Sequence, residues 1–243
     1  MIQRMLASAV FAGFAAGLFA ALLHFAFVQD FILMGERYES GAATHFGGPA
    51  PHPADPAAAP HDHADATVAH DHDHGTPASD LTRNGLTVAF AALLYVGYGL
   101  LLVAGFAVAE TMGRRVTARE GILWGIAGFA ALQLAPAMGL SPVLPGTLTA
   151  DLTQRQVWWL GTAIATAGGL ALLAYGRGPV AIAAAGALIA LPHLIGAPEL
   201  ATFSGTAPPE VAAAFAARTL GCGLAVWALL GWLAGRFWTA QAA

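Results

Sequence analysis

Lysine is absent from this sequence, so all ten basic residues are arginines. A Walker A phosphate loop needs a lysine after its glycines, so any ATP-driven step requires a partner. The single cysteine, Cys222, can form neither an internal disulfide nor a thiolate cluster, and its apolar neighbours are typical of a small buried side chain. The chain also lacks His-Glu-x-x-His, Gly-x-Ser-x-Gly and Cys-x-x-Cys motifs, so it offers no candidate catalytic residues and no enzyme is expected.

Charged residues are scarce as well: they form 10% of the chain, whereas 57% of the residues are hydrophobic and the mean hydropathy is +0.64. A water-soluble domain of this composition would lack a polar surface, so the chain must be surrounded mostly by lipid bilayer. The formal net charge of −4 gives no reason to expect a nucleic-acid partner. We therefore predict an all-α transmembrane bundle, because a bilayer requires backbone amides to be paired within each spanning segment.

Six apolar runs are long enough to cross the hydrocarbon core of a bilayer, which takes about 20 helical residues. They lie at residues 5–28, 86–109, 121–140, 157–175, 180–196 and 211–235. Pro136 and Pro192 interrupt the third and fifth runs, so we expect these helices to be kinked or partly unwound. The first run is longer than a usual signal-peptide core, which favours a retained helix. All six are assigned to a single membrane domain, residues 1–243.

Arginine positions predict the orientation, because basic residues near helix ends are held on the cytoplasmic side. Six crossings with both termini inside place a majority of the arginines in the cytoplasm: Arg4, Arg114, Arg115, Arg119, Arg177 and Arg236. The outer segments then hold Arg37, Arg83 and Arg155, together with most of the acidic residues. The connection between the first two helices is therefore expected to be extracytoplasmic.

Small and aromatic residues suggest how the helices pack. Glycines four apart let helix backbones approach closely, although chance spacing explains any one pair equally well in so Ala- and Gly-rich a chain. Such pairs occur at Gly13 and Gly17, Gly121 and Gly125, and Gly231 and Gly235. Aromatic belts at the two membrane surfaces are suggested by Trp158, Trp159, Trp232 and Trp238, although tryptophan also packs inside bundles. Glu110 is expected to pair with Arg114 and Arg115, and Gln133 to bridge helices.

Residues 41–80 change in composition to alanine, proline, histidine and aspartate, which cannot build a core. We predict a disordered loop whose candidate metal ligands are His61, Asp62, His63, His70, Asp71, His72, Asp73 and His74. Imidazole and carboxylate groups suit Co²⁺, Ni²⁺, Zn²⁺ and Cu²⁺. Only neutral imidazole binds, so affinity should fall below about pH 6.5. The alternative is a solvated low-complexity linker without metal-binding function.

Polar side chains near the outer helix ends form a second candidate site, because such groups are costly inside a membrane. His24 and His193 are expected at similar depth, where ions can pass from the loop into the bundle. Further candidates at this level are Glu36, Met138, Asp151 and Glu199. Either histidine can instead be an interfacial side chain hydrogen-bonded to a carbonyl. Asp151, followed by Gln154, is equally typical of a helix cap.

Several stretches of the chain resemble a known family. They are residues 36–39, the His/Asp-rich loop, residues 121–129 with 134–140, residues 192–198, and Asp151 with residues 155–159. Together they resemble CbtA, the predicted cobalt transporter subunit of bacteria, over nearly the whole chain. This resemblance implies a protein of the cytoplasmic (inner) membrane that takes up cobalt for cobalamin synthesis. It also implies a partner, the small histidine-bearing membrane subunit CbtB.

Three functions are compatible with these patterns. The leading hypothesis is a secondary or partner-assisted permease, in which the loop gathers Co²⁺, or Ni²⁺ or Zn²⁺, and the outer histidines receive it. No tightly bound cofactor is expected in that case. A metal sensor or scaffold would instead bind ions outside and transmit a shift to a partner. A membrane b-type haem protein would use His24 and His193 as axial ligands, but this would leave the loop unexplained.

Overall fold

The computed structural model describes residues 2–44, 77–202 and 204–240, which form helices and no strand. The predicted all-α class is confirmed for this part of the chain. The elements are α1 (Ile2–Phe27), α2 (Gln29–Glu39), α3 (Pro77–Thr111), α4 (Ala118–Phe129), the π-helix η1 (Ala130–Leu134), α5 (Ala135–Ala137), α6 (Leu152–Tyr175), α7 (Gly178–Ile195) and α8 (Pro209–Ala240).

Five helices in the described ranges are long and apolar enough to cross a membrane: α1, α3 from Asp80 onward, α6, α7 and α8. The remaining predicted span, the third at residues 121–140, is instead divided among α4, η1 and α5, which follow one another without a break over residues 118–137. Pro136 has no N–H to donate, and the π-turn just before it widens the helix. The irregularity expected from Pro136 is therefore a π-helical segment within a continuous helix.

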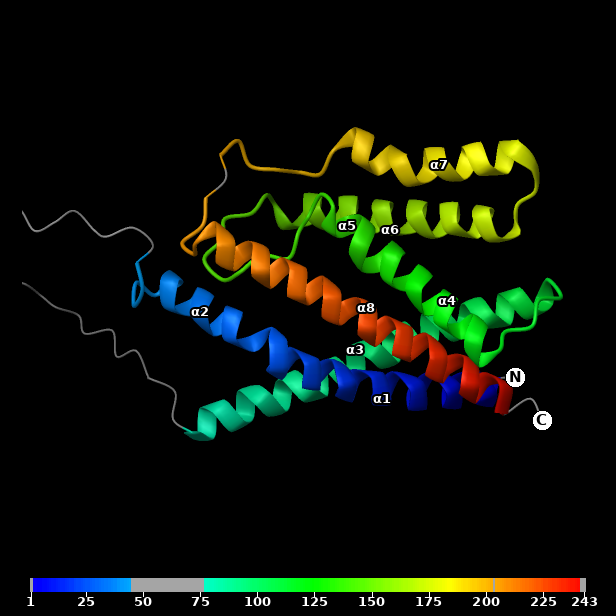
Figure 1. Ribbon diagram of the computed structural model, residues 1–243, viewed down its shortest axis with the longest axis horizontal. Helices are drawn as coiled ribbons and strands as arrows, with labels where there is room; N and C mark the ends of the chain where they lie inside the picture. Colours follow the sequence, from blue (N-terminus) through cyan, green and yellow to red (C-terminus); the bar gives the residue numbers. More distant parts are fainter. Residues whose placement is uncertain (1, 45–76, 203, 241–243) are drawn as a thin grey trace, which may run out of the picture.

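Both chain termini lie at one end of the molecule (Figure 1), together with the α3–α4 and α6–α7 connections. We call this the terminal end. The opposite end carries α2 and the connections that lead into α6 and α8, and we call it the loop end. The long helices thus run back and forth between two ends, as alternating membrane crossings require.

The chain bends at Val28 and continues as α2, a helix that the apolar pattern did not predict. Val28 packs with Leu144 and Phe215 in a small apolar cluster at the loop end, which attaches α2 to α8. Residues 77–80, expected in the loop, form the first turn of α3. Residues 45–76, which contain all eight predicted loop ligands, lie outside the described residues.

Glycines bring helix backbones together along two seams. Gly13 and Gly17 of α1 lie directly against the backbone of α3, so a Cβ atom at either position would overlap it. Gly121 of α4 meets Gly231 of α8 in the same way, and Gly125 meets the backbone of Trp227. The predicted close approach of glycine pairs is confirmed, and the seams hold α1 to α3 and α4 to α8.

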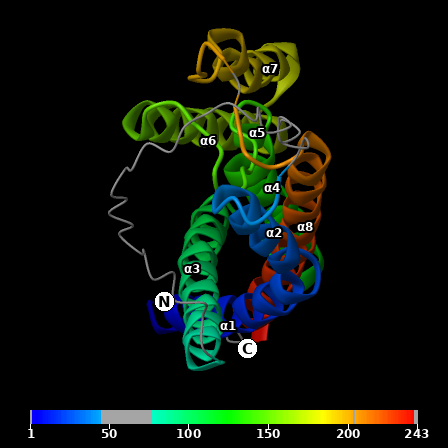
Figure 2. The same ribbon diagram turned by 90° about the vertical axis from the view of Figure 1, so that its left-hand side faces the viewer.

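Helices α6 and α7 form a hairpin beside the rest of the bundle (Figure 2). Among the described helices α7 contacts only α6, whereas α6 packs on η1 and α5 and makes few contacts with α4. At the loop end Gly139 gives room to the ring of Trp158, so this part of α6 lies close to the chain that follows α5. Toward the terminal end α6 stands away from α3 and α4.

Candidate functional site

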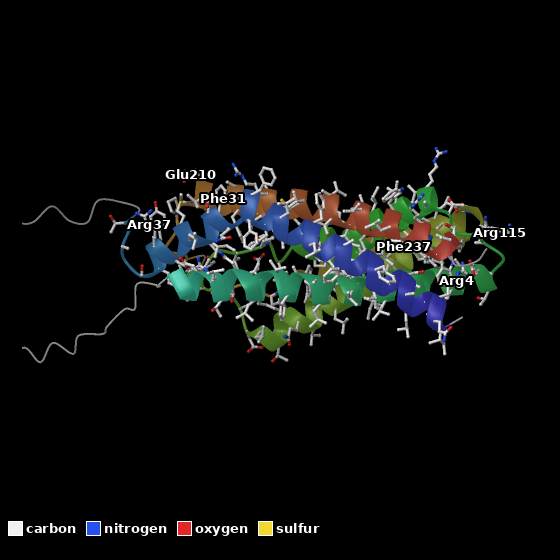
Figure 3. All side chains as sticks on the ribbon, turned by 90° about the horizontal axis from the view of Figure 1, so that it is seen from below. Arg4, Phe31, Arg37, Arg115, Glu210 and Phe237 are labelled. Carbon is white, nitrogen blue, oxygen red and sulfur yellow. The ribbon has the colours of Figure 1, made fainter. Side chains whose placement is uncertain are left out.

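Arg4 of α1 connects three helices at the terminal end, where Figure 3 labels it. Its guanidinium binds both carboxylate oxygens of Glu110 on α3, at 3.1 and 3.3 Å, and donates to the main-chain oxygen of Trp238 on α8 at 2.8 Å. The same guanidinium stacks 3.7 Å from the ring centre of Trp238, whose indole N–H donates to Glu110 at 2.6 Å. These charge-assisted contacts satisfy one another, so the cluster clamps helices together rather than offering an open site.

Two expectations about this end of the molecule are wrong. Glu110 pairs with Arg4 instead of Arg114 and Arg115, and Trp238 is fully buried in the bundle instead of lying in an aromatic belt. The backbone explains the first difference. Gly113 adopts a left-handed conformation with φ of +76°, so the chain turns sharply after α3 and carries both arginines toward the side of α4 and α6.

His193 is the predicted loop-end residue whose surroundings are most unusual. Its ring packs edge-on against Trp158 of α6, with ring centres 6.0 Å apart, and the Trp158 indole donates to the carbonyl of Pro192 at 3.2 Å. The Nε2 atom of His193 is buried, with no hydrogen-bond partner among the described residues. Because leaving such an atom unpaired is costly, His193 is available to bind a ligand.

Two predicted carboxylates at the loop end have structural partners. Asp151 caps α6 by accepting a hydrogen bond from the Gln154 backbone N–H at 3.0 Å, which is the alternative role predicted for it. Glu36 of α2 lies 3.9 Å from a guanidinium nitrogen of Arg83 on α3, an exposed pair that contributes little stability. These interactions explain both carboxylates without a metal ion.

The remaining loop-end candidates are dispersed. Glu199 is exposed and lines a cleft of about 460 Å³ together with Arg155, whereas Met138 is 72% exposed. His24 and His193 lie on α1 and α7, which are at opposite sides of the molecule with other helices between them (Figures 1 and 2), so this arrangement gives no support to a haem with both as axial ligands. Within the described ranges no three His, Cys, Asp or Glu side chains form a group that could hold a metal ion.

Polar side chains gather around η1, deep in the bundle. Gln133 interacts with the hydroxyl group of Tyr95 on α3, while its Oε1 faces Gly223 of α8 without a hydrogen-bond partner in the described part. Thr166 of α6 and Trp227 of α8 also have buried polar atoms that lack such a partner. π-Helical turns occur frequently at functional sites, because they displace backbone groups from the regular α-helical pattern.

Compared with known protein families, residues 2–239 match the family described as "Probable cobalt transporter subunit (CbtA)". The chain belongs to this family. The match spans nearly the whole chain and confirms the resemblance predicted from the sequence. No curated protein and no solved structure matches the chain.

Some polar residues of this CbtA-family bundle were not among the predicted site residues. The guanidinium of Arg218 on α8 lies 4.5 Å from the ring centre of Phe31 on α2. An arginine inside an apolar run is unusual, so the sequence itself could have indicated Arg218 as a candidate site residue. Tyr95, Thr166 and Trp227 carried no such signal, because one polar atom in an apolar helix is ordinary until its neighbours are known. The fold alone brings Tyr95 to Gln133.

Proposed function

We propose that this chain is the membrane subunit of a cobalt transporter that takes up Co²⁺ across the cytoplasmic membrane. The observation that carries the proposal is the match of residues 2–239 with the CbtA family. Five membrane-length apolar helices support a multi-pass architecture. Because the chain has no lysine and hence no Walker A loop, the transport energy comes from an ion gradient or from a partner, consistent with the word "subunit" in the family description.

The proposed route of the ion follows buried polar atoms that lack partners. A cation inside a bilayer needs nitrogen or oxygen ligands, and polar atoms already hydrogen-bonded elsewhere cannot supply them readily. His193 offers such an atom near the loop end, and Thr166 and Gln133 offer others at the middle of the bundle. His193 lies on α7, Thr166 on α6 and Gln133 on η1. Helix α7 packs against α6, and α6 packs against η1.

The capture step is assigned to the His/Asp-rich loop. Its eight candidate ligands, from His61 to His74, come from a segment flanked by α2 and α3 at the loop end. Imidazole and carboxylate ligands bind divalent transition metals and release them on protonation. In this proposal the loop end faces outward, the loop raises the local Co²⁺ concentration, and His193 receives the ion.

The proposal is tested by ⁵⁷Co²⁺ uptake into cells that express the chain with and without a small histidine-bearing membrane subunit. We expect deletion of residues 45–76 to raise the external Co²⁺ concentration needed for uptake while leaving the maximal rate measurable. We expect His193→Ala to abolish uptake at every concentration. Leu194→Ala is the matched control, because this neighbouring side chain is 82% exposed and should leave uptake unchanged.

The same measurements separate this function from a sensor or scaffold. Purified chain in proteoliposomes that binds Co²⁺ yet never accumulates it, with or without the partner, would favour a sensor. Normal uptake by a well-folded His193→Ala variant would remove His193 from the route. Accumulation of Ni²⁺ or Zn²⁺ in preference to Co²⁺ would change the assigned substrate but leave the transport function.

A further inference from the structure

A cleft of about 900 Å³ opens between α3, α4 and α6 at the terminal end. Its walls are apolar side chains such as Leu102 of α3, Leu123 of α4 and Leu170 of α6, with Trp227 of α8 among the lining residues. The cleft exists because α6 has few contacts with α4 and none with α3. The short side chains of Ala127 on α4 and of several alanines on α6 leave the space between the two walls unfilled.

Two arginines stand at the mouth of this cleft. Gly113 and the hydrogen bond from the Arg114 N–H to the carbonyl of Ala109, 2.9 Å long, shape the turn after α3, and the buried Val116 anchors it. Arg114 and Arg115 are therefore held at the cleft while their side chains stay exposed, without an ion pair among the described residues. Figure 3 shows Arg115 at the extreme terminal end.

The one acidic residue that lines the mouth is already engaged. Glu120 accepts a hydrogen bond from the Thr117 backbone N–H at 2.7 Å, as part of the capping box that begins α4. The Thr117 hydroxyl and the Glu120 carboxylate already cap the first turn of α4, so the positive charge of the mouth comes from the two arginines. Two unpaired arginines against one carboxylate leave the mouth with a net positive charge, which attracts a phosphate.

The cleft covers only half of a membrane. On α3 the lining extends from the terminal end as far as Leu101, which is ten residues from Thr111, or roughly 15 Å at 1.5 Å per residue. A bilayer core is about 30 Å thick, so along α3 the cleft spans about one leaflet. Ala131 and Leu132 of η1 form the inner end of the lining, where η1 and α5 pack against α6 and close the gap. A transmembrane helix of a partner would need a groove along the whole thickness, whereas a lipid occupies one leaflet.

We propose that this cleft binds an anionic phospholipid from the leaflet at the terminal end. The headgroup phosphate lies against Arg114 and Arg115, and the acyl chains lie between α4 and α6. The bound lipid fills the space that separates the α6–α7 hairpin from α3 and α4, and so supports the hairpin that carries His193. Lipid binding is independent of transport, so its failure would leave the cobalt proposal untouched.

Native mass spectrometry of the purified full chain tests the proposal directly, with phosphatidylglycerol and phosphatidylcholine of identical acyl chains as probes. We expect one phosphatidylglycerol to be retained with an apparent affinity about tenfold or more above that for phosphatidylcholine. Thermal unfolding should show the same preference. Inorganic phosphate alone should give no shift, because it cannot fill the apolar cleft.

Matched variants separate the cleft from general surface charge. Arg114→Gln with Arg115→Gln should remove the preference for the anionic lipid, and Arg114→Lys with Arg115→Lys should largely keep it. Arg119→Gln with Arg236→Gln removes two exposed arginines of the same end that do not line the cleft, and should keep it fully. Ala171→Trp should fill the cleft and lower lipid retention, whereas Ala183→Trp on the exposed side of α7 should not.

Three results would overturn the proposal. Equal retention of the two lipids would show that the arginines do not select a headgroup. An equal loss of preference in the Arg114→Gln/Arg115→Gln variant and in the Arg119→Gln/Arg236→Gln variant would assign the effect to general surface charge. A polypeptide that copurifies in equal amount and is displaced by Ala171→Trp would make the cleft a protein-docking site.

Discussion

Arg4, Glu110 and Trp238 show how polar side chains are stabilised in this apolar bundle: each binds the other two. The side chains of Gln133 and His193 differ, because each leaves a buried atom without a hydrogen-bond partner in the described part of the chain. Unpaired buried atoms cost free energy, whereas mutually satisfied ones stabilise the fold. The first group therefore stabilises the fold, whereas the second supplies the unpaired atoms on which the proposed ion route rests.

The cluster of Arg4, Glu110 and Trp238 at the terminal end gives a stability prediction. Glu110→Ala leaves the Arg4 guanidinium and the Trp238 indole N–H without their carboxylate, so we expect the free energy of unfolding to fall by about 1–3 kcal/mol. Thermal unfolding of the purified protein measures the loss. Glu39→Ala removes an exposed carboxylate at the other end of the molecule and should change the midpoint little. Equal effects of the two variants would contradict the claim that the contacts of Glu110 with Arg4 and Trp238 stabilise the fold.

Gln133 gives a prediction that separates stability from transport. Gln133→Leu removes a buried amide whose Oε1 is unpaired, but it also removes the partner of the buried Tyr95 hydroxyl. We therefore expect a loss of at most about 1–3 kcal/mol of stability, with the protein still folded, and a loss of Co²⁺ uptake. The control is Gln154→Leu, at an exposed position in the first turn of α6. Uptake that persists in stable Gln133→Leu protein would exclude this residue from the route.

At the scale of elements, apolar runs predicted where helices occur, but they did not predict how the helices are joined or the form of each interruption. Pro136 predicted an irregularity in the run at 121–140, but not that it would be a π-turn before the proline. The composition of α2 is only moderately apolar, so this helix is stabilised by packing of Val28 and its neighbours against α8. Such features depend on tertiary contacts that periodicity does not record.

The α4–α8 seam gives a prediction at this scale. Gly231→Ala would place a Cβ atom against the backbone of Gly121, so we expect a loss of roughly 1–3 kcal/mol of stability from overpacking. Gly221→Ala is a control on the same helix, because no atom lies near its position and alanine favours helix by up to about 1 kcal/mol. Thermal unfolding compares the two variants. A smaller loss for Gly231→Ala than for Gly221→Ala would show that the seam is not tightly packed.

For the whole molecule, orientation follows from charge and from the two ends of the bundle. The terminal end carries six arginines: Arg4, Arg114, Arg115, Arg119, Arg177 and Arg236. Basic residues are held on the cytoplasmic side, so the loop end is expected to face outward. This orientation is what the capture step requires, because the His/Asp-rich loop leaves from the loop end.

Cysteine labelling tests the orientation, because Cys222→Ala removes the single thiol. In that background we expect Ser141→Cys, at the loop end, to react with a membrane-impermeant maleimide in intact cells. Met112→Cys, an exposed position at the terminal end, should react only after the membrane is permeabilised. The opposite pattern would place the termini outside and would exclude capture of external cobalt by the loop.

Composition and the lengths of the apolar runs were sufficient to predict the membrane environment and the helical class, because lipid leaves a chain few ways to pair its amides. The resemblance of several short stretches indicated the family. The tertiary structure alone decided which polar groups satisfy one another. It placed Arg4 against Glu110, put the helices of His24 and His193 apart, brought Tyr95 to Gln133 and opened the cleft beside α6. These relations depend on which helices are neighbours, and residues far apart in sequence carry no signal of that.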